Sequence, residues 1–150
     1  MKKDVVLFSI KPKFANKIFS GEKTAELRRI RPKQVGRGDL ALVYVSSPIK
    51  SLVGAFEIEN IIEAPVESLW QLLKGRAGIS FEEFTEYFKG AETGVGILFN
   101  SCWQLAEPVE LKELREASNT FNPPQSFRYP SEKELSLSFF TKLTSDSLSN

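Results

Sequence analysis

The chain has 150 residues, of which 41% are hydrophobic and 26% charged, as expected for one globular domain with a substantial core. It contains no histidine and a single cysteine, Cys102, which excludes serine–histidine triads, cysteine–histidine zinc sites and an intramolecular disulfide. We find no signal peptide and no stretch approaching the ~20 apolar residues of a membrane span. We therefore expect a cytoplasmic protein without membrane contact, metal or cofactor.

The net charge of +1 conceals an uneven distribution along the chain. Residues 1–50 hold twelve Lys and Arg against four Asp and Glu, a net charge of +8. Residues 51–100 carry −5 and residues 101–150 carry −2. Such segregation indicates a basic face directed at an anion, with phosphate as the first candidate. Ordinary solvation of surface lysines and arginines is an equally good explanation at this point.

The first elements alternate between strand and helix. Residues 5–10 form a continuous apolar run that predicts a buried strand. Pro12 suits the first turn of a helix, which then continues at helical spacing to a break at Gly21. Residues 22–28 are read as a short strand with one polar face, and residues 29–38 as a basic loop.

Three further strands follow. Residues 40–45 form a second apolar strand after the Gly38-Asp39 turn. Residues 52–62 form a longer strand in which Gly54 marks a bulge or a close approach of another segment. Residues 94–105 alternate apolar and polar side chains and predict another strand.

Helices are predicted between and after these strands. Pro65 opens one helix, and a second begins at the N-cap Ser80 with Glu83 completing a capping box. The second helix is expected to bury a stripe formed by Phe81, Phe84 and Phe88. A short helix is expected within residues 110–116.

The C-terminal part combines a loop and a helix. Residues 117–130 are a loop by composition, packed down by its aromatic residues. Ser131 and Glu134 form another capping box, and one helix then carries Leu135, Phe139 and Leu143 on its buried face. Residues 144–150 are expected to fray. The order of elements argues against a doubly wound parallel sheet and favours an α+β protein with a partly closed β-barrel whose ends are covered by helices.

A dense group of charged residues follows the first helix. Gly21, Lys23, Glu26 and Arg28 fill the pattern G-x-K-x-x-E-x-R. Since strand side chains alternate, Glu26 and Arg28 are expected on one face and Lys23 on the other, unless a bulge turns it. The cations Arg28, Arg29, Arg31 and Lys33 crowd into six residues, so bound anions or nearby carboxylates must relieve their repulsion. A structural ion pair between Glu26 and Arg28 is the alternative to a ligand site.

On these residues the chain resembles the ASCH family of the PUA-like superfamily. The resemblance rests on Ile10-Lys11-Pro12, on the G-x-K-x-x-E-x-R pattern, on the Gly38-Asp39 turn and on the strand through Gly54. It covers residues 5–62, with weaker agreement at 94–105, and residues 124–129 are similar to a second family element. It implies a small PUA-like β-barrel with helices covering its ends and a helical insertion before the last long strand, in a single domain spanning residues 1–150.

The resemblance also implies a basic cleft beside the first helix that binds RNA, a nucleotide or a modified base. Cations would contact phosphate or base edges, Glu26 would orient them, and serines near strand ends would donate hydrogen bonds. Phe127 and Tyr129, on either side of Arg128, would stack on bases. The expected ligand-binding set is Ser9, Lys11, Lys23, Glu26, Arg28, Arg31, Ser46, Ser47, Phe127, Arg128 and Tyr129.

Whether the chain is an enzyme stays open at this stage. Some small family members are amidohydrolases that act on N4-acetylcytidine with a lysine, a threonine nucleophile and a glutamate. Lys23 matches that lysine, but Glu26 occupies the threonine position, and Thr24 would point to the opposite face of a regular strand. Other members are linked to RNA cleavage, for which Lys23, Glu26 and Arg28 would be the catalytic residues of a metal-independent ribonuclease.

A third alternative is a protein-interaction module in transcription regulation. The family's association with coactivators suggests it, and the acidic helices within residues 65–89 would meet a basic partner. The sequence identifies no such protein partner.

Overall fold

A computed structural model of the chain describes residues 3–146, which form a six-stranded mixed sheet and six helices. The strands are β1 (Val5–Ile10), β2 (Ala25–Arg28), β3 (Leu40–Val45), β4 (Ser51–Pro65), β5 (Thr93–Glu110) and β6 (Phe127–Arg128). The helices are α1 (Pro12–Ser20), α2 (Val66–Leu73), α3 (Phe81–Tyr87), α4 (Leu111–Ala117), α5 (Glu132–Leu135) and α6 (Ser138–Asp146). The predicted α+β class is confirmed.

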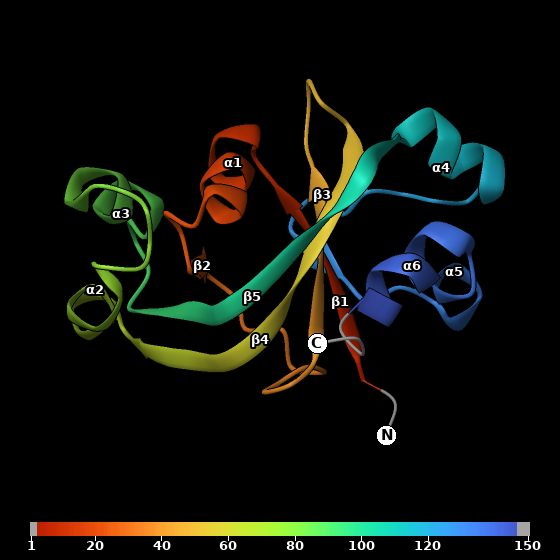
Figure 1. Cartoon of the computed structure of the whole chain (residues 1–150). Helices are drawn as coiled ribbons and strands as arrows, with labels where there is room; N and C mark the ends of the chain where they lie inside the picture. Colours follow the sequence, from red (N-terminus) through yellow and green to blue (C-terminus); the bar gives the residue numbers. More distant parts are fainter. Residues whose placement is uncertain (1–2, 147–150) are drawn as a thin grey trace.

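The sheet has the strand order β2-β5-β4-β3-β1-β6 and curls into a half-barrel. Only β1 and β3 pair in parallel, and the other neighbours are antiparallel. The long strands β4 and β5 run side by side across the molecule, with α2 and α3 at one end and α4 at the other (Figure 1). Helices therefore cover both ends of the half-barrel, as the PUA-like fold implies.

The core between sheet and helices is mostly aliphatic and contains several stacked phenylalanine rings. The ring centroids of Phe56 and Phe99 are 4.0 Å apart, and Phe8 stacks on Phe56 at 6.3 Å. Gly54 lies where the backbone of β5 and helix α1 come closest: a Cβ there would lie 2.3 Å from the Trp103 carbonyl oxygen and 2.8 Å from the Phe19 ring. The predicted close approach at Gly54 is therefore confirmed.

Local signals placed several boundaries correctly. Helix α1 begins with Pro12 and ends at Gly21, whose φ of 89° is in the left-handed region that glycine tolerates. Ser80 and Glu83 form both hydrogen bonds of the capping box that starts α3. These short-range interactions fix the ends of the two helices that flank the candidate site described below.

Three expectations for the N-terminal two thirds were wrong. The strand predicted over 22–28 begins only at Ala25, because the Lys23 N–H donates to the Lys17 carbonyl (3.0 Å) in a bend that follows α1. Phe81 is not part of a buried stripe: it is 54% exposed and packs against Trp70 at a centroid distance of 5.3 Å. The strand predicted to end at residue 62 continues to Pro65, which is the N-cap residue of α2 and so opens that helix as predicted.

The C-terminal region also differs from expectation. The loop predicted at 117–130 contains β6, whose two residues pair with Leu7 and Phe8 of β1. The single helix predicted after Ser131 is two helices, α5 and α6. This break places Phe140 rather than Phe139 in the core. Of the tail expected to fray, residues 144–146 belong to α6 and 147–150 lie outside the described residues.

Candidate functional site

A pocket of about 400 Å³ lies beside α1, within the size range of small-molecule sites. It is bordered by the end of β1, the start of α1, strand β2, the N-terminal side and end of α3, and the segment before β6. Its lining comprises Ser9, Ile10, Lys11, Phe14, Lys23, Glu26, Leu27, Arg28, Ser46, Ile79, Glu83, Tyr87, Gln125 and Ser126. Parts of the chain that are distant in sequence therefore meet at this pocket.

Lys23 is buried at this pocket, with only 2% of its surface exposed. Its Nζ donates to the Ala77 carbonyl (2.8 Å), lies 3.7 Å from Glu26 Oε1 and sits 5.3 Å from the centre of the Phe14 ring. Burial lowers the pKa of Lys23, the Glu26 carboxylate opposes that shift, and the positive charge of Arg28 adds to it. Lys23 is therefore more easily deprotonated than an ordinary lysine.

The Lys23 side chain reaches the Glu26 carboxylate and does not face the other side of a strand, which was expected unless a local irregularity turned it. The reason is the bend before β2, which takes Lys23 out of the strand alternation. Gly78 faces the Lys23 backbone closely, since a Cβ on Gly78 would lie 3.0 Å from the Lys23 Cβ. The bend and this contact together direct the ammonium toward the pocket.

Glu26 and Arg28 form a buried ion pair on β2, with 5% and 8% of their surfaces exposed. Arg28 donates to Glu26 Oε2 from both Nε (3.0 Å) and Nη2 (2.6 Å). Its Nη2 also donates to the Ser9 carbonyl (3.0 Å), and Nη1 donates to the carbonyl (3.2 Å) and hydroxyl (3.1 Å) of Ser126. The five N–H groups of the guanidinium thus all have acceptors within the protein. Arg28 bridges β2 to β1 and to the segment before β6, across the open side of the half-barrel.

Within the buried cluster of Lys23, Glu26 and Arg28, the remaining hydrogen-bonding capacity belongs to Lys23 and Glu26. Arg28 uses only Oε2 of Glu26, and the 3.7 Å between Oε1 and Lys23 Nζ is too long for a strong hydrogen bond. The pocket therefore presents an ammonium donor and a carboxylate acceptor side by side. A ligand group placed there could accept from Lys23 and donate to Glu26.

The rest of the pocket is largely apolar, and Lys11 and Glu83 are the other charged residues that line it. Ile10, Phe14, Leu27 and Ile79 supply apolar surface, and burial raises the pKa of Tyr87. Glu83 accepts from Lys13 Nζ (2.7 Å) and from the Ser80 N–H (3.1 Å), and these hydrogen bonds lower its pKa to about 2. Apolar walls around a few polar groups suit a flat, partly polar ring.

Six of the eleven residues expected at the site line this pocket: Ser9, Lys11, Lys23, Glu26, Arg28 and Ser46. The other five do not. Arg31 and the exposed Ser47 are absent from the lining. Phe127 packs edge-on against Phe8, the Tyr129 hydroxyl accepts from the Gln34 N–H, and Arg128 forms two hydrogen bonds with Glu134. In this structure the predicted stacking rings serve as packing contacts.

The expected convergence of all cations after α1 is only partly present. Lys23 and Arg28 meet at the pocket, whereas Arg29 points away and donates from Nη1 to the carbonyls of Tyr87 (2.9 Å) and Lys89 (3.2 Å). Sequence reasoning also missed several pocket residues, namely Phe14, Ile79, Glu83, Tyr87, Gln125 and Ser126. The only available signal was the family-like element at residues 124–129. In it Gln125 and Ser126 directly precede Phe127, Arg128 and Tyr129, which were expected to bind the ligand.

Comparison with known proteins agrees with this geometry. The model of the ASCH domain family matches residues 8–138. The chain belongs to the ASCH family. The matched span contains the G-x-K-x-x-E-x-R residues as well as Ser126, so the pocket lies within the ASCH domain.

Curated proteins similar to this ASCH domain include one of similar length. The "ASCH domain-containing ribonuclease" of Zymomonas mobilis subsp. mobilis is 32% identical over 133 residues, which cover 89% of this chain and 88% of that protein. The large ribosomal subunit protein uL22 of Ureaplasma parvum is 26% identical over 127 residues, or 84% of this chain and 39% of that protein.

Solved structures support the same fold. The crystal structure of ASCH from Zymomonas mobilis has a TM-score of 0.83 at 30% identity and covers 96% of each chain. The N-terminal domain of Staphylothermus marinus McrB has a TM-score of 0.54 at 13% identity, covering 97% of this chain and 98% of that one. The second likeness concerns the fold alone.

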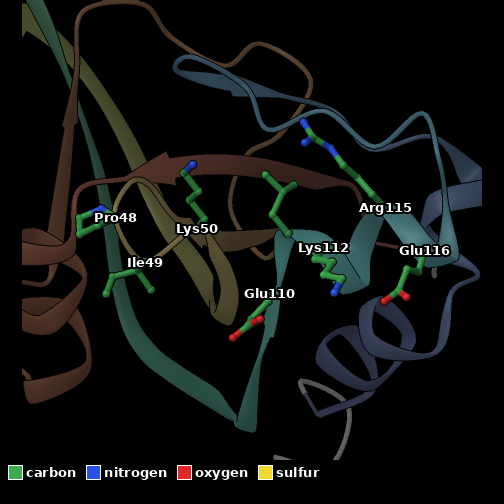
Figure 2. A pocket seen from close by; sticks show the side chains of 8 residues that line it. Pro48, Ile49, Lys50, Glu110, Lys112, Arg115 and Glu116 are labelled. Atoms are coloured by element: carbon green, nitrogen blue, oxygen red, sulfur yellow. The ribbon is translucent and has the colours of Figure 1, made fainter.

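A second hollow of the ASCH domain lies between the β3–β4 turn and α4 (Figure 2). It is shallower and exposed, and cations and carboxylates alternate around it: Lys50, Glu110, Lys112, Arg115 and Glu116. None of these side chains is buried. The buried pair at the first pocket has no counterpart here, so the first pocket is the better candidate site.

Two findings concern other classes of site. Within residues 3–146, no three Asp, Glu or Cys side chains gather closely enough to hold a metal ion. None of the helices in the described part of the chain has the length and apolar character needed to cross a bilayer.

Proposed function

We propose that this ASCH domain binds single-stranded RNA, with one base in the pocket beside α1, and that it cleaves the RNA there. The observation that carries the proposal is the buried Lys23–Glu26 pair, whose ammonium and carboxylate remain available to a ligand. The Zymomonas mobilis relative that is named a ribonuclease supports the choice of RNA and of cleavage.

The pocket has the properties that a splayed-out base requires. Single-stranded RNA is recognised by bases that leave the stack and pack against side chains while their edges form hydrogen bonds. Phe14 and Ile79 offer such surface, and Lys23 and Glu26 offer a donor and an acceptor to a base edge or a ribose. Lys11, exposed at the rim, is placed to meet a phosphate. The charge of +8 on residues 1–50 attracts the strand as a whole.

Cleavage would proceed by attack of a ribose 2′-oxygen on the adjacent phosphorus. In the proposed reaction Glu26 Oε1 takes the 2′-hydroxyl proton, and the new bond between the 2′-oxygen and phosphorus displaces the 5′-oxygen of the next nucleotide. Lys23 stabilises the charge on phosphorus and gives its proton to the departing 5′-oxygen. The lowered pKa of Lys23 makes its ammonium a better proton donor near neutral pH. The products are a 2′,3′-cyclic phosphate and a 5′-hydroxyl.

Arg28 has a positioning role in this proposal. Because its N–H groups are taken up by Glu26, Ser9 and Ser126, it has none left for a bidentate contact with phosphate. It holds Oε2 of Glu26 and so directs Oε1 toward Lys23. This differs from the direct phosphate contact expected from sequence.

The amidohydrolase alternative finds less support. The threonine that would act as nucleophile is replaced by Glu26, and the Thr24 hydroxyl accepts a hydrogen bond from Arg76 Nε (2.9 Å) outside the pocket lining. The interaction-module alternative depends on acidic residues of α3 such as Glu82 and Glu86, which are exposed, and nothing in the described structure singles out a basic partner.

The test is cleavage of 5′-labelled single-stranded RNA in buffer containing EDTA. We expect cleavage by the wild type to fall about 100-fold or more in Lys23→Met and in Glu26→Gln, because each removes a proton-transfer group. Lys74→Met changes an exposed lysine outside the pocket and should cleave normally. Equal cleavage by all four proteins would assign the activity to a contaminant.

A binding measurement covers the case in which a variant folds poorly. RNA methylated at its 2′-oxygens cannot be cleaved, so its binding can be measured with the active wild type. We expect it to shift the NMR signals of residues 9–11, 23–28 and 125–126. Affinity should decrease as salt increases. If these signals stay unchanged at low salt, the pocket is not the RNA site.

A further inference from the structure

A third hollow, of about 680 Å³, adjoins the pocket directly. Tyr87 and Ser126 line both, so these two residues form a shared wall between them. The other residues of this hollow, called the Ile30 hollow below, are Arg29, Ile30, Ala91, Glu92 and Thr93. The pocket and the Ile30 hollow are therefore separated by a single layer of side chains.

The surface of the Ile30 hollow suits a flat ring better than a phosphate. Ile30 is 69% exposed, the highest value among the large apolar side chains of the described residues, and the partly exposed Tyr87 lies on the shared wall. The carboxylate of Glu92 accepts hydrogen bonds from a base, and its negative charge offsets the attraction of Arg29 for a phosphate. Because the two charges oppose each other beside an exposed apolar side chain, an uncharged base fits this hollow better than a phosphate.

Arg29 gives this hollow a fixed planar group. Its Nη1 donates to the carbonyls of Tyr87 (2.9 Å) and Lys89 (3.2 Å) at the end of α3, which holds the guanidinium in place. Among residues 3–146, the side-chain hydrogen bonds of Arg29 all come from Nη1, so Nε and Nη2 remain available. Guanidinium planes are common stacking partners of unpaired bases in RNA recognition.

We propose that the Ile30 hollow is a second base subsite, which takes the nucleotide next in the strand to the one in the pocket. The inference rests on the proposed RNA binding and makes it more specific: the ligand is a strand of at least two nucleotides rather than a free nucleoside. The linking sugar–phosphate passes over the Tyr87–Ser126 wall. The second base packs on Ile30 and the Arg29 guanidinium.

The test compares one nucleotide with two. The probes are the four ribonucleoside 3′-phosphates and the corresponding homodinucleotides, methylated at their 2′-oxygens so that they cannot be cleaved, and titrated by calorimetry. With the wild type we expect the best dinucleotide to bind about fivefold or more tightly than its mononucleotide, since one stacked base contributes that much. Ile30→Ser should remove this gain and leave the mononucleotide affinity unchanged.

Ile49→Ser is the matched control. Ile49 is 50% exposed and lies on the β3–β4 turn, at the hollow shown in Figure 2. Ile49→Ser makes the same substitution at another exposed isoleucine and should keep the full dinucleotide gain. Mononucleotide binding with no dinucleotide gain, or a gain that survives in Ile30→Ser, overturns the second subsite alone. Absence of binding by every probe overturns the proposed function together with it.

Discussion

Two of the arginine–glutamate pairs of this half-barrel involve the segment around β6, and they share much of their chemistry. Arg28 pairs with Glu26 near the N-terminus, and Arg128 pairs with Glu134 near the C-terminus. Each guanidinium also lies over a phenylalanine ring. Arg28 is 4.7 Å from the centre of the Phe8 ring, and Arg128 is 5.2 Å from the centre of the Phe121 ring. From sequence, both arginines were candidates for ligand contact.

The two pairs differ in how many carboxylate oxygens remain free to accept a hydrogen bond from a ligand. Both oxygens of Glu134 are used, because Oε1 accepts from Arg128 Nη1 and the Ser131 N–H while Oε2 accepts from Arg128 Nη2. Glu26 keeps Oε1 free of Arg28, directed toward Lys23 and the pocket. The comparison teaches that a candidate site is best recognised by hydrogen-bonding groups that face a cavity and have no partner within the protein. A charged residue in a basic segment does not by itself indicate a site.

The largest expected effect is that of Arg28→Met. This change leaves the Glu26 carboxylate buried without its partner and removes the donors to Ser9 and Ser126, so we expect a loss of about 3–5 kcal/mol in the free energy of unfolding. Urea denaturation measures it. Arg28→Met combined with Glu26→Gln should recover part of the loss, because the unpaired charge is then gone. A loss below about 1 kcal/mol would show that the bridge across the half-barrel contributes little.

Arg128→Met should have a smaller effect and leave RNA binding intact. The Arg128 side chain is partly open to water, so its loss should cost about 1–2 kcal/mol in the same denaturation measurement. Because Arg128 lies outside the pocket lining, the affinity for 2′-O-methylated RNA should equal that of the wild type. Weaker RNA binding by a stably folded Arg128→Met protein would show that Arg128 contacts the RNA, as expected from the sequence.

The sequence predicted well the features that depend on neighbouring residues. Pro12 and Gly21 bound α1, and Ser80 caps α3, because each acts through the backbone within one turn. The spacing from Lys23 to Arg28 likewise pointed to residues that line one pocket, since they lie close together along the chain. Both helices beside the pocket could therefore be predicted from sequence.

The features that could not be predicted from sequence depend mainly on contacts between segments that are far apart along the chain. Ser126 reaches Arg28 across 98 residues of sequence, and Tyr87 joins the pocket because α3 packs beside β2. The orientation of Lys23 depends instead on a short-range bend that strand alternation does not reveal, in which the Lys23 N–H donates to the Lys17 carbonyl of α1. The stacking role given to Phe127 and Tyr129 rested on their place in a polar segment, whereas β6 pairing draws that segment onto the core.

The smallest expected effect concerns Glu83 at the pocket rim. Its pKa is lowered from 4.5 to about 2, first by the hydrogen bond from Lys13 and then by the Ser80 N–H. A carboxylate whose pKa is lower in the folded state stabilises the fold above the unfolded value, and this contribution is lost as the pH falls from about 4.5 to 2. Lys13→Gln should therefore raise the Glu83 midpoint only part of the way back, because the Ser80 bond of the capping box remains.

Carbon-detected NMR titration of the side-chain carboxyl resonances measures this midpoint. Glu134 is the internal reference, because its pKa is lowered by Arg128 at the other pair and should not respond to Lys13→Gln. A Glu83 midpoint that stays at about 2 in the variant would assign the whole shift to the helix cap. The rim would then carry a fixed negative charge independent of Lys13, and a strand entering the pocket could pair with that lysine at no electrostatic cost to Glu83.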